Sequence, residues 1–294
     1  MTLPQTYRIR PPLRDFLADR SWRSAVVAHR GAWHGAPENS IASVELAIEN
    51  GYEFVEIDVQ VTADGELICL HDDTLDRMTG QPGAVAQQRT EDITSLYLKD
   101  GMGGQGAALT GSRPPLLGDL LDVSAGKIYV DIDVKHLRDL EAVSSFVRDH
   151  PYRAHFNLKT LVREDVDLRF AEVIEQRTGV LVKPVIQVTA DTLGTCLGFL
   201  QARTLPLVEV LFDDWQSFEL YARAASLSGT DMFLNTLDDV PSADVTDTLS
   251  LKDPDRGWGR LIDHGVRLIQ TDRPEALKAY ITAAEMPEPG LQPV

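Results

Sequence analysis

Two histidines, two alternating carboxylates and an arginine occur close together near the start of this chain. They stand in three short segments, Val27-Ala28-His29-Arg30-Gly31, Phe54-Val55-Glu56-Ile57-Asp58-Val59 and Leu70-His71-Asp72. Carboxylate oxygens bind hard divalent cations, arginine pairs with phosphate, and imidazole exchanges protons near neutral pH. Together these residue types are suited to breaking a phosphate ester with the help of a metal.

The carboxylates follow the two-residue period of a strand. Glu56 and Asp58 therefore share one face, and we expect that face to point into a barrel. In Val130-Asp131-Ile132-Asp133-Val134-Lys135 the acids alternate again, so Asp133 can complete an oxygen cage with Glu56 and Asp58 while Lys135 meets a phosphate. Mg²⁺ or Ca²⁺ suits such ligands. A salt-bridged barrel interior or a half-exposed edge strand would give the same pattern.

His29 and His71 each follow an apolar run, as residues at the ends of strands do. A single such histidine is usually an ordinary hydrogen-bonded side chain. Two at one end of a barrel allow one ring to accept a proton while the other donates. Arg30 offers a bidentate fork for phosphate oxygens, and Gly31 would let the backbone pass close to a ligand.

Apolar β-branched runs alternate with amphipathic segments over most of the chain. This order predicts βαβ units, a parallel sheet and closure into an α/β TIM (β/α)8 barrel. The expected strands are 25–28, 53–61, 66–70, 128–134, 180–188, 207–212, 231–234 and 266–270. The expected helices are 40–50, 137–148, 191–202, 215–225 and about 256–264.

A long stretch between Asp72 and Lys127 lacks a clear barrel strand. We expect an insertion after the third strand, at about 74–114, placed at the catalytic mouth. The glycine-rich run Gly101–Gly106 fits neither common phosphate-loop pattern and is interpreted as flexible. Residues 1–24 are expected to form an N-terminal arm, either ordered beside the barrel or plugging its bottom, and 25–294 to form one barrel domain.

The composition limits the partners. The 294 residues carry 28 basic and 45 acidic side chains, for a net charge of −17, which disfavours nucleic acid and anionic membranes. No stretch has the length and hydropathy of a membrane span or a secretory signal. The two cysteines cannot form a disulfide framework, and Cys69 is expected to be a buried thiol. A cytoplasmic location is the resulting expectation; the oligomeric state stays open.

Several motifs resemble those of the glycerophosphodiester phosphodiesterase family. The resemblance covers residues 25–280 in the right order, except about 140–230. Its motifs are His29-Arg30-Gly31, Pro37-Glu38-Asn39-Ser40, Glu56-Ile57-Asp58, His71-Asp72, Leu75–Thr79, Pro115–Leu121, Asp133-Val134-Lys135 and Gly265–Pro274.

The resemblance implies a metal-dependent phosphodiesterase that releases an alcohol from a glycerophosphodiester and leaves glycerol 3-phosphate. It further implies the following roles: His29 and His71 as the acid/base pair, Glu56, Asp58 and Asp133 as ligands of one Mg²⁺ or Ca²⁺, and Arg30 and Lys135 as phosphate-binding residues.

Two departures from the family pattern bear on the substrate. Asp133 stands where Glu is common. Met232-Phe233-Leu234-Asn235 stands where many members have Trp-Thr-Val-Asn, so the Trp is replaced by Met232, and Trp33 or Trp215 can substitute for it. Lys183 is either a further phosphate contact or a solvent-facing side chain. The alternatives are the same chemistry on a lysophospholipid or sugar phosphodiester, a non-catalytic phosphate-ligand binder, and a metal-dependent aldolase or lyase on the same barrel.

Overall fold

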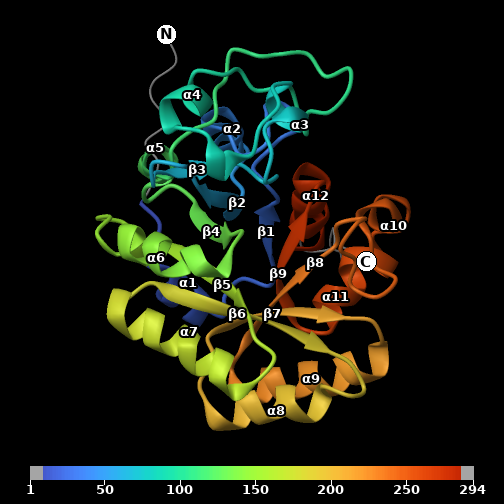
Figure 1. Cartoon of the computed structure of the whole chain (residues 1–294). Coiled ribbons are helices and arrows are strands. Elements are labelled where there is room, and N and C mark those ends of the chain that lie inside the picture. Colours follow the sequence, from blue (N-terminus) through green and yellow to red (C-terminus); the bar gives the residue numbers. More distant parts are fainter. Residues whose placement is uncertain (1–8, 286–294) are drawn as a thin grey trace.

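A closed barrel of eight parallel strands forms the centre of the chain, as predicted (Figure 1). The computed structural model describes residues 9–285. The strands follow the order β1-β9-β8-β7-β6-β5-β4-β2, and pairing of β1 with β2 closes the ring. Their bounds are β1 Ala25–Ala28, β2 Phe54–Val61, β4 Tyr129–Val134, β5 Phe156–Leu161, β6 Leu181–Val188, β7 Leu207–Phe212, β8 Asp231–Asn235 and β9 Val266–Thr271.

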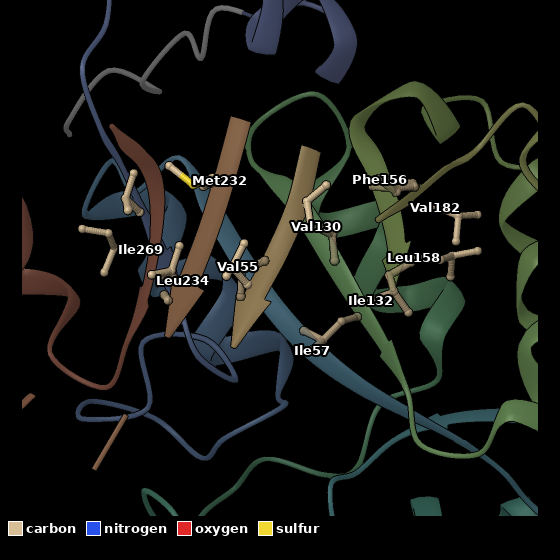
Figure 2. Close-up of a cluster of buried hydrophobic side chains, with 14 of the residues drawn as sticks. Val55, Ile57, Val130, Ile132, Phe156, Leu158, Val182, Met232, Leu234 and Ile269 are labelled. Atoms are coloured by element: carbon tan, nitrogen blue, oxygen red, sulfur yellow. The ribbon is translucent and has the colours of Figure 1, made fainter. Parts of the chain in front are cut away.

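Helices surround the barrel and cover the outward faces of its strands (Figure 1). Alternate apolar residues such as Val55, Ile57 and Ile132 point outward into this layer (Figure 2), so the acids between them point inward. Burying each such side chain stabilises the fold by about 1.5–3 kcal/mol. The helices are α2 Ile41–Glu49, α5 Leu117–Ser124, α6 Leu140–Arg148, α7 Asp165–Thr178, α8 Leu193–Ala202, α9 Trp215–Ser228, α10 Asp247–Lys252, α11 Arg260–Asp263 and α12 Pro274–Glu285, with the π-helical turn η4 Asp255–Gly259 before α11.

Residues 9–24 lie across the end of the barrel where the strands begin. Helix α1, Leu13–Ala18, buries Leu13 and Leu17 against the first inward side chains of the strands, among them Phe54 and Tyr129. This packing seals the barrel floor opposite the expected catalytic mouth. Residues 1–8 lie outside the described part of the chain, and the domain boundary at residue 24 stays a prediction.

The segment between β2 and β4 builds a small subdomain beside the mouth (Figure 1). It buries its own apolar cluster, which includes Ile68, Met78 and Ile93. Its elements are β3 Leu67–Cys69, α3 Asp76–Thr79, the 3₁₀ turn η1 Val85–Gln87 and α4 Thr90–Thr94. The insertion expected after the third strand is present, and β3 itself belongs to it. As expected, the Cys69 thiol is buried.

The assignment of individual strands to the barrel needs one correction. Residues 66–70 were expected to form a barrel strand, but β3 pairs antiparallel with β2, with Val59 opposite Cys69. The missing barrel strand is β5, Phe156–Leu161. Its inward positions are polar and it offers only a few apolar residues, so its pattern is too weak to stand out. The helix that follows it, α7, was missed with it.

No helix within residues 9–285 has the length and hydropathy needed to cross a bilayer.

Candidate active site

A cavity of about 470 Å³ opens at the end of the barrel where the parallel strands finish. The structure brings every predicted site residue to its wall: His29, Arg30, Glu56, Asp58, His71, Asp133 and Lys135. His71 arrives by a route that the sequence did not indicate. Strand β3 runs back along β2, so its last residues return to the mouth beside Asp58.

Three carboxylates meet in this cavity because of the strand register. Asp58 on β2 lies directly opposite Asp133 on β4, and Glu56 precedes Asp58 on the same inward face. One oxygen from each of the three lies within 4.8 Å of the others. Glu56 and Asp58 are both 1% exposed, so water contributes little to stabilising their charges.

Two lysines partly neutralise the carboxylates. Lys135 Nζ donates hydrogen bonds to Asp58 Oδ1 at 2.8 Å and to Asp133 Oδ2 at 3.1 Å. Lys159 Nζ lies further away, 3.3 Å from Asp133 Oδ2 and 3.7 Å from Glu56 Oε1. Burial opposes ionisation of Asp58, but Lys135 and Arg30 outweigh it and hold the pKa of Asp58 well below its usual range.

Glu56 is left short of positive charge. Burial, reinforced by the neighbouring Asp58 carboxylate, raises the pKa of Glu56 to about 7. A buried oxygen cluster with one poorly neutralised acid fits a hard divalent cation, whose charge would favour the ionised form of Glu56. The donor set therefore fits Mg²⁺ or Ca²⁺ better than zinc, which prefers nitrogen and sulfur.

Each histidine is held by an aspartate. His29 Nδ1 lies 2.8 Å from Asp272 Oδ1, and His71 Nδ1 lies 2.7 Å from Asp72 Oδ1. The pKa of Asp272 is lowered and that of Asp72 falls to about 2, since in both cases hydrogen bonds and nearby cations outweigh burial. An ionised carboxylate only accepts, so Nδ1 carries the proton in both rings. The remaining ring nitrogen, Nε2, is then free to accept or deliver a proton.

Arg30 is more constrained than the sequence indicated. Its guanidinium donates to Glu38 Oε2 at 3.1 Å, its Nε lies 3.4 Å from Asp58, and its backbone N–H donates to Glu56 Oε2 at 3.1 Å. Arg30 therefore orders the carboxylates in addition to lining the cavity. Gly31 adopts a φ of +86°, and an added Cβ would collide with the Ser43 side chain, so the backbone itself requires glycine here. That Gly31 also lets the backbone pass close to a ligand stays a prediction.

A second layer of side chains, without assigned roles in the sequence analysis, fixes the first. Asn39 adopts a φ of 53°, and its side chain both donates to Asp58 Oδ2 at 2.7 Å and accepts from the Asp58 N–H at 2.9 Å. Arg77 bridges Glu38 and Asp72 with hydrogen bonds of 2.6 Å to each. In the sequence, only the position of Asn39 and Arg77 within the family motifs indicated that they belong to the site.

The interior below the cavity corrects the interpretation of Lys183. This lysine is neither a phosphate contact nor solvent-facing: it is fully buried and lies 2.7 Å from both Asp131 and Glu209, with its Nζ over the ring of Phe233. In β6 the lysine stands among apolar residues, a pattern that is also typical of a strand whose polar side chain faces solvent. Here the lysine points into the barrel interior instead.

The two tryptophans proposed to replace the missing aromatic side chain lie in different parts of the structure. Trp33 lines the cavity and its Nε1 donates to Asp272 Oδ1 at 2.9 Å, whereas Trp215 begins helix α9 outside the barrel and its ring stacks against Arg260. Only Trp33 can stand in for the missing aromatic wall.

Comparisons with known proteins show which families the chain resembles. Residues 29–164 match the glycerophosphoryl diester phosphodiesterase family, and residues 183–281 match a domain of unknown function. The chain is 37% identical over 114 residues to a glycerophosphodiester phosphodiesterase of Caldanaerobacter subterraneus subsp. tengcongensis, a match covering 38% of this chain and 46% of that protein. The chain thus spans about half the length of the curated relatives it matches first.

Solved structures share the fold. A glycerophosphoryl diester phosphodiesterase from Parabacteroides distasonis superposes with a TM-score of 0.70 at 20% identity, over 97% of this chain and 96% of that one. An Oleispira antarctica phosphodiesterase, solved in complex with the product sn-glycerol-3-phosphate, gives a TM-score of 0.61 at 22% identity, over 88% of this chain and 96% of that one. At these identities the likeness establishes the barrel fold.

Proposed function

We propose that the chain, whose residues 29–164 match the glycerophosphoryl diester phosphodiesterase family, hydrolyses a glycerophosphodiester to an alcohol and glycerol 3-phosphate. The observation that carries the proposal is the pairing of two functions in one cavity. Two aspartate-held imidazoles, His29 and His71, line the same cavity as a cluster of three carboxylates. A non-catalytic binder would have no use for two oriented proton carriers. An aldolase of the Schiff-base type would need a deprotonated lysine there, whereas the neighbouring carboxylates outweigh burial and raise the pKa of both Lys135 and Lys159.

Glu56, Asp58 and Asp133 would hold one Mg²⁺ or Ca²⁺. When bound, the cation withdraws charge from a phosphoryl oxygen and so stabilises the charge that accumulates in the transition state. Lys135, already at the edge of the carboxylate cluster, adds a positive charge toward the phosphate.

The imidazoles transfer protons. One Nε2 takes the proton from the attacking oxygen, which belongs to water or to the neighbouring substrate hydroxyl, and the other gives a proton to the departing alcohol. When the neighbouring hydroxyl attacks the phosphorus, the alcohol leaves and a cyclic phosphate forms, which water then opens. Both routes therefore consume one water in total. Asp272 and Asp72 keep each ring in the Nδ1–H form throughout.

Substitution of the histidines tests the proposal. His29→Ala and His71→Ala should each lower turnover of glycerophosphocholine about 10²–10⁴-fold, the usual contribution of a positioned proton transfer. His264→Ala is the matched control, because His264 caps Arg260 O on the outside of the barrel. Unchanged melting temperatures would show that the fold survives. Full turnover in either cavity variant would refute the mechanism.

The identity of the leaving group is a separate question. The cavity is lined partly by apolar side chains, namely Trp33, Met102, Leu211, Leu237 and Val240, which leaves a lysophospholipid as the second candidate beside a small glycerophosphodiester. Turnover of glycerophosphocholine, a lysophospholipid and a sugar phosphodiester, each with Mg²⁺, Ca²⁺ or chelator, distinguishes them. Preference for the lysophospholipid would replace the proposed substrate but not the chemistry.

A further inference from the structure

Lys159 is a cation at the floor of the cavity for which the proposed chemistry gives no role. It lies on the inward face of β5, two residues after Asn157, and only 13% of its side chain is exposed. It also lines the cavity, so its ammonium faces the space in which a substrate would sit. Neither the family resemblance nor the strand prediction pointed to it.

The contacts of Lys159 are looser than those of the other interior lysines. Lys135 lies within ordinary hydrogen-bond distance of two carboxylates, at 2.8 and 3.1 Å. Lys183, its register partner on β6, lies 2.7 Å from two acids and is fully buried. The closest carboxylate oxygens to Lys159 lie at 3.3 and 3.7 Å, near or beyond the limit of a good N–H···O bond. Lys183 is thus a structural counter-ion, while Lys159 keeps hydrogen-bonding capacity.

The charges around Lys159 indicate which kind of ligand its free hydrogen-bonding capacity would bind. The acids nearest Lys159 are Asp133 and Glu56, two of the proposed metal ligands. A divalent cation on these oxygens would compete with the ammonium for the same negative charge. Two positive centres facing one cavity are both satisfied when an anion lies between them.

We propose that Lys159 is a second phosphate-binding residue, acting beside Lys135 on an oxygen of the phosphoryl group. The inference rests on the proposed function, since it names the residue that would hold the substrate's phosphate and that of glycerol 3-phosphate. Of the carboxylate oxygens near Lys159, Asp133 Oδ2 lies nearest to its ammonium, at 3.3 Å.

Calorimetry on the full chain tests this assignment. Glycerol 3-phosphate, and separately inorganic phosphate, are titrated into wild type, Lys159→Met and Lys159→Arg at saturating Mg²⁺. Loss of one charge-assisted hydrogen bond should weaken binding of both ligands about 10- to 100-fold in Lys159→Met, with partial recovery in Lys159→Arg. Lys127→Met is the control, because Lys127 contacts Val123 O at the barrel floor, and it should bind as wild type does.

A second titration, of Mg²⁺ without phosphate, separates phosphate binding from a structural role. The proposal expects Mg²⁺ to bind Lys159→Met as tightly as wild type or more tightly, because a competing cation is gone. Unchanged phosphate binding with tighter Mg²⁺ binding would overturn it and leave Lys159 as a counter-ion only. Weaker Mg²⁺ binding would overturn it in favour of a role in ordering the carboxylates.

Two further outcomes are decisive. If Lys159→Met lowers the melting temperature, Lys159→Gln, which keeps a polar end, replaces it in the same titrations, and unchanged phosphate binding there overturns the proposal. A wild-type protein that binds neither phosphate ligand in Mg²⁺ would refute the proposed function itself, and the inference with it.

Discussion

The pKa of Glu56 makes cation binding to this site depend on pH. Burial and the Asp58 carboxylate raise that pKa from the ordinary 4.5 to about 7, equivalent to about 3 kcal/mol between the two protonation states. A metal ligand must be ionised, so binding expels the proton wherever Glu56 carries one. With a pKa of about 7, the protonated fraction is about 0.9 at pH 6 and about 0.1 at pH 8.

The affinity for Mg²⁺ or Ca²⁺ should therefore be close to tenfold weaker at pH 6 than at pH 8. Titration calorimetry in two buffers of different ionisation enthalpy gives the number of protons released, expected at about 0.9 per cation at pH 6 and about 0.1 at pH 8. Asp58 adds nothing in this range, since Lys135 and Arg30 keep its pKa low despite its burial.

The matched control is Asp133→Asn, which removes one ligand but retains Glu56. It should bind the cation more weakly at both values of pH and still release the proton at pH 6. Equal wild-type affinity at pH 6 and pH 8, with no proton released at pH 6, would refute the argument that Glu56 is a buried, poorly neutralised ligand.

Three further perturbations follow from the same contacts. Asp272→Asn removes the acceptor of His29 Nδ1, so kcat should fall about 10²–10⁴-fold with KM little changed, and a kcat within about threefold of wild type would contradict this. Arg77→Ala leaves Glu38 less well paired in its buried position, and should cost on the order of 3 kcal/mol in urea unfolding; a loss under about 1 kcal/mol would argue against the Arg77 bridge. Burial raises the pKa of Asp247 to about 6, so ionisation of this carboxyl should destabilise the fold by about 3 kcal/mol as the pH rises from about 4 to 6. The free energy of unfolding of the wild type, measured relative to that of Asp247→Asn, should therefore fall across this interval. Parallel pH profiles of the two proteins would exclude this.

Local patterns were sufficient to predict the strands that carry the carboxylates. In β2 and β4, apolar residues alternate strictly with acids, and this two-residue period fixes which side chains face the barrel interior. Parallel pairing then places Asp58 opposite Asp133. The metal-ligand prediction therefore needed only the strand period and the expectation that both strands belong to one barrel.

Other parts of the site depend on contacts that no local pattern records. Asp272 reaches His29 across 243 positions of sequence. Lys159 was missed because β5 has too few apolar residues to be recognised as a strand, although its inward polar side chains are what make it part of the site. The direction of β3 was also predicted wrongly, because an apolar run indicates a strand but does not indicate whether that strand pairs parallel or antiparallel with its neighbour.

The central claim concerns one divalent cation held by oxygens of β2 and β4 in the cavity that the two imidazoles line. Crystals soaked in Ca²⁺ and measured for anomalous scattering test it most directly. The account predicts a single peak in the cavity about 2.3–2.6 Å from oxygens of Glu56, Asp58 and Asp133. The account would be contradicted if the cavity shows no peak, Lys135 and Lys159 still contact the three carboxylates, and the ion is bound elsewhere.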